Sequence, residues 1–134
     1  RGNVVTQYAE RDDVRSEQWR HANVLLEPDG SSVRYYWYDG PQPMHVQTSW
    51  SDDTLMIGDC GPRSEADDVG AQDWLSVIRL VDGRSEYQPL CRHGSSWRTQ
   101  GSHPHPVFWP GDLWVMFSSD RGGRCNIYRA EVRR

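Results

Sequence analysis

Turn-forming residues interrupt this chain so often that a long helix has no room to form. Glycine, proline and aspartate gather at five places between apolar runs: Pro28-Asp29-Gly30, Asp39-Gly40-Pro41, Asp82-Gly83, Pro110-Gly111-Asp112 and Arg121-Gly122-Gly123. No window of the sequence repeats apolar residues at i, i+3, i+4 and i+7, which is the spacing of an amphipathic helix. The chain is therefore expected to fold from short strands joined by turns.

Nine runs rich in β-branched and aromatic residues lie between these turns, and each is predicted to be a strand. Their ranges are 23–26, 33–38, 45–50, 54–58, 74–80, 86–91, 105–109, 113–118 and 126–132. Short strands at this spacing are typical of an all-β sandwich, barrel or propeller.

A weak internal repeat favours the propeller. Residues 45–58 are similar to residues 105–117: each begins with a histidine and a strand, then turns into a second apolar strand. We predict antiparallel four-stranded meander blades, about three of them, in a single all-β domain over 1–134: a partial blade over 1–44, a complete blade over 45–93 and a final blade over 94–134. Propellers use four to eight blades, so a chain of this length is a fragment of a longer propeller, closes by oligomerising, or arranges its blades in another all-β fold. We expect a partial β-propeller that associates with other copies into a homo-oligomer.

Composition excludes several classes of partner. The net charge is -4 and the 15 basic residues, all arginine, are scattered along the chain, which argues against nucleic-acid binding. No apolar run approaches the roughly 18 residues of a membrane helix. Three cysteines without a Cys-x-x-Cys spacing predict neither a disulfide framework nor a structural zinc site, and they favour a reducing, cytoplasmic location.

The segment Gln100-Gly-Ser-His103-Pro-His105-Pro106 is the most informative for chemistry. If it forms a strand, residues i and i+2 share a face, so His103 and His105 present their imidazoles side by side. Gln100 is close enough for a turn to bring in its carbonyl oxygen, and His45 occupies the matching position in the repeat. Three imidazoles and an amide oxygen suit Mn²⁺, Fe²⁺ or Zn²⁺. The alternative is that both histidines are ordinary turn residues between prolines.

These residues also carry a resemblance to a known family. The run from Leu90 to Trp97 (LCRHGSSW), the run from Gln100 to Pro106 (QGSHPHP) and Phe117-Ser-Ser-Asp120 are similar to the C-terminal part of the oligogalacturonate lyases. The last strands also resemble the TolB-type propeller repeat. The resemblance implies seven-bladed propellers that cleave galacturonate oligomers by β-elimination. It implies a metal, usually Mn²⁺, held by three histidines and one glutamine, which by position are His45, Gln100, His103 and His105.

The resemblance also implies roles for other residues. A uronate oligosaccharide is the expected substrate, and loss of its C5 proton builds negative charge that a divalent cation and a nearby arginine would stabilise. Arg92 and Arg98 are candidates for that arginine, or else solvated surface residues. His93 and Trp97 are candidate sugar contacts, and His93 is alternatively a residue that orients a metal ligand. In the lyases a histidine of an earlier blade takes the proton, and His21 is the candidate here, although its surroundings depart from the family pattern.

Two rival interpretations stay open at this stage. The first is a non-catalytic metal- or carbohydrate-binding module on the same partial propeller, which the departure at His21 favours. The second is a cupin-like metal enzyme, which also uses His-x-His on a strand. The cupin pattern needs a glutamate soon after the pair, whereas the residues at 107–109 are all apolar.

Overall fold

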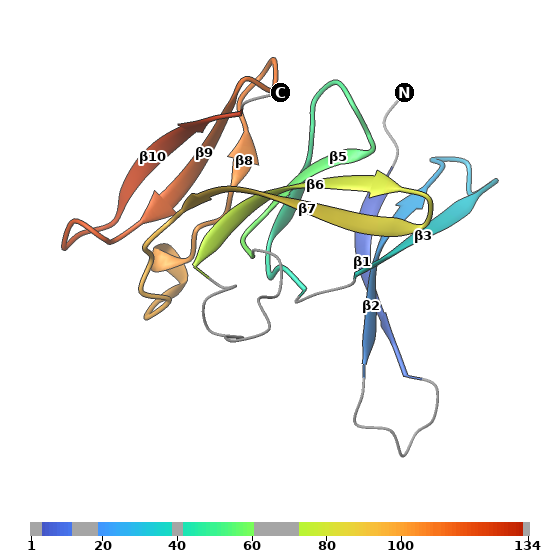
Figure 1. Ribbon diagram of the computed structural model, residues 1–134, viewed down its shortest axis with the longest axis horizontal. Coiled ribbons are helices and arrows are strands. Elements are labelled where there is room, and N and C mark those ends of the chain that lie inside the picture. Colours follow the sequence, from blue (N-terminus) through green and yellow to red (C-terminus); the bar gives the residue numbers. More distant parts are fainter. Residues whose placement is uncertain (1–3, 12–18, 39–41, 61–72, 133–134) are drawn as a thin grey trace.

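Ten strands and one short 3-10 helix form the described part of the chain, which comprises residues 4–11, 19–38, 42–60 and 73–132 of a computed structural model (Figure 1). The helix η1 spans Gln100–Ser102. The strands are β1 (Val4–Glu10), β2 (Arg20–Leu26), β3 (Val33–Tyr38), β4 (Val46–Thr48), β5 (Leu55–Gly58), β6 (Trp74–Val81), β7 (Arg84–Arg92), β8 (Val107–Phe108), β9 (Trp114–Ser119) and β10 (Asn126–Glu131).

The strands form two sheets. A seven-stranded sheet has the order β1-β2-β3-β7-β6-β5-β4, and a three-stranded sheet has the order β10-β9-β8. Every pairing is antiparallel except that between β3 and β7, which is parallel and joins only Trp37 to Arg84 and Tyr38 to Ser85. The all-β class and the propeller-like meanders are therefore confirmed, and β4–β7 is a complete four-stranded meander.

Two features of the sheets were not expected. The strand β1 lies in a region where the residue pattern predicted no strand. The short β3–β7 pairing also merges the first three strands with the meander β4–β7, where separate blades were predicted. The boundaries proposed after residues 44 and 93 stay predictions.

The hairpin between β6 and β7 shows how local chemistry builds these meanders. Asp82 and Gly83 both have positive φ, 47° and 76°. This is the pattern of a type I′ turn, whose twist matches that of the flanking strands, and Asp-Gly is among its favoured sequences. The turn brings Val81 opposite Arg84 and starts a ladder that runs almost the whole length of both strands.

Strands β5 and β6 are buried on both faces and so separate two apolar cores. Leu55, Ile57, Leu75 and Val77 face the three-stranded sheet, where they pack against a cluster that includes Phe108, Val115 and Phe117. The alternate residues of the same strands enter a second cluster whose buried members are Leu25, Tyr36, Met56, Ile78 and Leu80. Because successive side chains along a strand point to opposite faces, β5 and β6 contribute to both cores, and the first of these cores joins the two sheets.

The seven-stranded sheet curls, and this brings its two edges together. Strands β1 and β4 lie at opposite ends of the strand order, yet Val5 and Val46 pack against the same core cluster. The Gln7 amide also donates a hydrogen bond to the Pro43 carbonyl, at 2.8 Å, just before β4. In Figure 1, β1 and β2 accordingly run at a steep angle to β6 and β7. The curl places β1 beside the start of β4, where His45 lies.

A buried carboxylate joins the two sheets. Asp112, in the turn between β8 and β9, is fully buried and accepts hydrogen bonds from the loop after β4. Its donors are the Ser49 hydroxyl (2.8 Å), the Trp50 backbone N–H (2.9 Å), and the Ser51 backbone N–H (3.1 Å) and hydroxyl (2.5 Å). This contact fixes β8, and the histidine segment before it, against β4.

In the part of the chain that the structure describes, no helix is long and apolar enough to cross a membrane.

Candidate metal centre

Three histidine side chains converge where β4 adjoins β8. One ligand atom from each of His45, His103 and His105 lies within 4.8 Å of the others, and all three residues are partly buried. The ring centroids are 4.0 Å apart for His45 and His105, 5.5 Å for His45 and His103, and 5.8 Å for His103 and His105. The structure thus brings together the three imidazoles singled out in the sequence.

The prediction that His103 and His105 lie on a strand is wrong. His103 ends the 3-10 helix η1, His105 has a positive φ of 43°, and β8 begins only at Val107. Pro104 and Pro106 explain the difference, because a proline has no N–H to donate to a strand ladder. The imidazoles meet because the chain turns sharply between the prolines, and a hydrogen bond from the Ser118 N–H to the Pro104 carbonyl, at 2.7 Å, holds this turn on β9.

Gln100 lies against His105. Its amide Nε2 is 3.2 Å from the His105 Nε2, and its backbone carbonyl is 3.3 Å from the same nitrogen. The nitrogen and oxygen of a side-chain amide exchange places by a half-turn of the terminal torsion. Gln100 is therefore positioned to offer an oxygen on the His105 side of the group.

Trp97 packs against the imidazoles. Its ring is nearly parallel to that of His45, at 13° and 6.3 Å between centroids, and lies 4.8 Å from that of His103. It adopts a positive φ of 58°, which is unusual for a bulky residue. Strained backbone at both Trp97 and His105 is the kind of strain that concentrates at functional sites.

His93 packs against the edge of Trp97. It is completely buried, its Nδ1 accepts the Ser95 N–H at 2.9 Å, and its ring meets the edge of Trp97 at 5.7 Å. A side chain in this position has no surface with which to contact a sugar, so the predicted sugar contact does not fit the structure. The physical role that does fit is holding the Trp97 loop.

Three other predicted residues lie away from the imidazoles. The Arg92 guanidinium is 3.7 Å from an Asp73 carboxylate oxygen and stacks on Trp74 at 5.3 Å. Arg98 is exposed, and its charge helps to lower the pKa of Asp120, after the hydrogen bonds from Ser96. His21 lies on β2, and its Nδ1 is buried without a partner among the described residues. None of the three lines the pocket beside the imidazoles.

Asp59 is a residue of this site that the sequence patterns did not predict. Its carboxylate, buried immediately after β5, accepts hydrogen bonds from both the ring Nδ1 and the backbone N–H of His45. The sequence did contain a signal for it, because residues 45–50 and 54–58 read as neighbouring strands. In that hairpin Val46 pairs with Gly58, so the residue after the second strand lies opposite His45.

The donor set suits a divalent metal. Imidazole nitrogens suit borderline cations such as Fe²⁺ and Zn²⁺, and an amide oxygen suits the harder Mn²⁺. The Nδ1 of His103 is buried and has no hydrogen-bond partner in the described part of the chain, which leaves its bonding capacity unused. A pocket of about 440 Å³ opens beside His45 and His105, with Gln7, Met44 and Gln47 also in its lining, so a ligand can reach the imidazoles.

Comparison with known proteins bears directly on this site. The chain is 31% identical to the oligogalacturonate lyase of Dickeya dadantii (strain 3937), and the match covers 69% of this chain and 26% of that protein. The corresponding match to the oligogalacturonide lyase of Pectobacterium atrosepticum is 32% identical with the same coverage. This chain resembles part of an oligogalacturonate lyase. It spans about a quarter of the length of these relatives, and no family model matches it.

Solved structures of these lyases have a similar fold. An oligogalacturonate lyase from Vibrio parahaemolyticus superposes with a TM-score of 0.71 at 23% identity, over 98% of this chain and 37% of that protein. An oligogalacturonate lyase in complex with manganese superposes with a TM-score of 0.66 at 25% identity, over 96% of this chain and 32% of that protein. The resemblance to the lyases found in the sequence is therefore confirmed, and it extends to the propeller-like fold.

Proposed function

We propose that His45, His103, His105 and Gln100 hold a divalent cation, Mn²⁺, and that the site acts on uronate-containing oligosaccharides. The convergence of three imidazoles within 4.8 Å carries this proposal. The manganese complex of a structural neighbour supports the choice of metal. The names of the relatives support lyase chemistry, the β-elimination of a pectic oligosaccharide.

The residues of this chain would orient the imidazole ligands and let a sugar reach the metal. A bound divalent cation would neutralise a uronate carboxylate while the adjacent C5 proton is removed. Trp97 keeps the imidazoles of His45 and His103 in place, and the pocket beside His45 and His105 leaves that side open to a sugar. Arg92 or Arg98 for the developing charge, and His21 for the base, stay predictions, since none of them lines this pocket.

A reducing, cytoplasmic setting also stays a proposal, which rests on the odd number of cysteines and the lack of a Cys-x-x-Cys spacing in the sequence.

A direct assay tests the lyase proposal. The manganese-loaded chain is expected to convert di- and trigalacturonate into unsaturated products, followed by their ultraviolet absorbance. The matched control is His105→Ala, which removes one proposed ligand and is expected to lower the rate at least about 100-fold, in line with losses of metal-site function. Absence of product with every divalent metal tried would exclude the lyase activity for this chain.

A non-catalytic binding module is the second candidate. One observation favours it: apart from the proposed ligands His45 and His105, the residues lining the pocket are amide or apolar side chains, so no separate base faces it. In this case the metal-loaded chain would bind trigalacturonate in calorimetry and release no unsaturated product.

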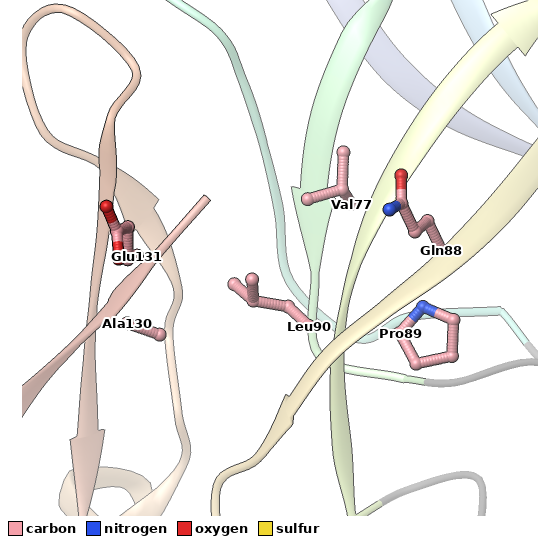
Figure 2. A pocket seen from close by; sticks show the side chains of 6 residues that line it. All are labelled: Val77, Gln88, Pro89, Leu90, Ala130 and Glu131. Atoms are coloured by element: carbon pink, nitrogen blue, oxygen red, sulfur yellow. The ribbon is translucent and has the colours of Figure 1, made fainter. Parts of the chain in front are cut away.

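We also propose that copies of the chain associate through the free edge of β10. The sheet β8–β10 has three strands, whereas the meander β4–β7 has four, and β10 has no neighbour on its outer side within the described region. A groove of about 370 Å³ lies between β7 and β10, lined by Val77, Leu90 and Ala130 among others (Figure 2). A strand from a second copy beside β10 would form hydrogen bonds with the unpaired backbone groups of this edge and cover the groove.

Light scattering coupled to size-exclusion chromatography tests the association. The wild-type chain is expected to elute as an oligomer, and Ile127→Lys, which puts a charge on the exposed edge strand, is expected to shift it to a monomer. Val33→Lys is the matched control, because Val33 is also an exposed strand residue but lies on β3 of the other sheet, where it pairs with Leu26 of β2. A wild-type monomer at high concentration would contradict the proposal.

A further inference from the structure

Asp59 and His45 are joined by three hydrogen bonds. The two oxygens of the Asp59 carboxylate accept separately: Oδ1 from the His45 backbone N–H at 2.9 Å, and Oδ2 from the His45 ring Nδ1 at 2.5 Å. The Asp59 backbone N–H donates in return to the His45 carbonyl at 3.3 Å. The Asp59 side chain is fully buried, whereas that of His45 is 25% exposed. Both oxygens of the Asp59 carboxylate thus bind the same residue, His45, which immediately precedes β4.

The contact determines which nitrogen of His45 is free. A carboxylate only accepts hydrogen bonds, so the His45 Nδ1 must carry the proton that it shares with Asp59. The neutral ring then has its lone pair on Nε2. The parallel Trp97 ring restricts rotation of the same imidazole. The Asp59 contact therefore fixes the tautomer of His45, and both contacts limit the orientation of its ring.

The other two imidazoles lack this support. The buried His103 Nδ1 has no partner in the described region, and the His105 Nε2 faces the exposed Gln100. Of the three imidazoles, only that of His45 has a buried carboxylate on its ring within the described residues. Hydrogen bonds of this kind orient metal-binding histidines and make them more basic ligands.

We propose that Asp59 is a positioning residue that fixes the Nδ1–H tautomer of His45 and thereby raises the affinity of the site for its divalent cation. The part of this inference that concerns cation affinity rests on the proposed metal site. The part that concerns the tautomer of His45 does not, and it can be measured in the absence of metal.

The variant Asp59→Asn replaces one of the two acceptor oxygens of Asp59 with an NH2 group. Asparagine keeps the size of the side chain but offers only one acceptor oxygen to two N–H donors. Its amide NH2 must then face either the backbone N–H or the ring Nδ1 of His45. Asp29→Asn makes the same chemical change in an exposed turn and is the matched control.

The first measurement is the tautomer, by long-range ¹H–¹⁵N correlation spectra of the metal-free protein at mildly alkaline pH. The signals that disappear in His45→Ala identify the His45 ring. We expect the Nδ1–H pattern in the wild type and in Asp29→Asn, and a smaller share of the Nδ1–H tautomer in Asp59→Asn, whose NH2 group competes with its oxygen for the ring nitrogen. An Nε2–H pattern for His45 in the wild type would overturn the inference.

The second measurement is Mn²⁺ affinity by calorimetry, in a double-mutant cycle. Asp59→Asn is expected to weaken binding about 10- to 100-fold in the wild-type background. In the His45→Ala background it is expected to have no further effect, because the ring it positions is gone. Equal losses in both backgrounds would mean that Asp59 acts only through general structure, which overturns the inference. A wild type that binds no Mn²⁺ would instead contradict the proposed function and leave the tautomer result standing.

Discussion

Replacing His103 by alanine is expected to reduce the manganese content of the purified chain from about one ion to nearly none. The substitution removes one of three imidazoles whose ligand atoms lie within 4.8 Å of one another. Loss of a residue that only supports a ligand typically costs about 10- to 100-fold in metal affinity, so loss of the ligand itself is expected to cost about 100-fold or more. Mass spectrometry of the dialysed protein measures the metal content, and calorimetry measures the dissociation constant.

His21→Ala is the matched control, since it also removes a partly buried histidine but from β2, outside the cluster. Its metal content is expected to equal that of the wild type. Thermal unfolding gives an independent reading: Mn²⁺ at about 100 times its dissociation constant stabilises a one-site protein by roughly 2.7 kcal/mol. That shift is expected in the wild type and in His21→Ala, but not in His103→Ala. Equal metal content in all three proteins would rule out the site.

Features governed by neighbouring residues were predictable from the sequence. The strand predicted over 33–38 matches β3 residue for residue, and the turn at Asp82-Gly83 lies at its predicted position. Both depend on local chemistry, the alternation of side chains and the ease of positive φ at Asp and Gly. The parallel contact between β3 and β7 carries no such local signal. It involves two residue pairs from strands far apart in the sequence, and only packing of the whole sheet determines it.

The candidate site shows the same division. Its ligands His45, Gln100, His103 and His105 could be named from their type and spacing, but the reason given for their meeting was wrong. A strand would place His103 and His105 on one face, whereas the prolines prevent that strand and a sharp turn brings the imidazoles together. Asp59 was missed because an aspartate after a strand is common. Only the register of the hairpin gives it a partner.

Asp112→Asn is expected to destabilise the fold by about 3 kcal/mol at neutral pH, or roughly 10 °C in Tm. Asp112 is completely buried, and its two oxygens accept four hydrogen bonds from the Ser49–Ser51 loop. Asparagine would turn one of those acceptors into a donor facing other donors. The control is Asp82→Asn, because Asp82 also has positive φ but is exposed, so any effect of asparagine on that backbone conformation appears in both variants. Urea unfolding measures the difference.

The pH dependence of the unfolding free energy shows whether the charge of Asp112 or the shape of its side chain stabilises the fold. Burial alone would raise the pKa of Asp112, but hydrogen bonds from Ser51, Trp50 and Ser49 outweigh burial and hold the pKa below its usual value. A lowered pKa in the folded state means that the ionised carboxylate stabilises the fold above the unfolded pKa of about 3.9, and that this contribution fades as the pH falls toward the folded value. The gap in unfolding free energy between the wild type and Asp112→Asn is therefore expected to be full at pH 7 and to narrow below about pH 4. A gap that keeps its size down to low pH would show that the Asn side chain disturbs packing, and that the ionised carboxylate is not what holds β8 and the histidine segment against β4.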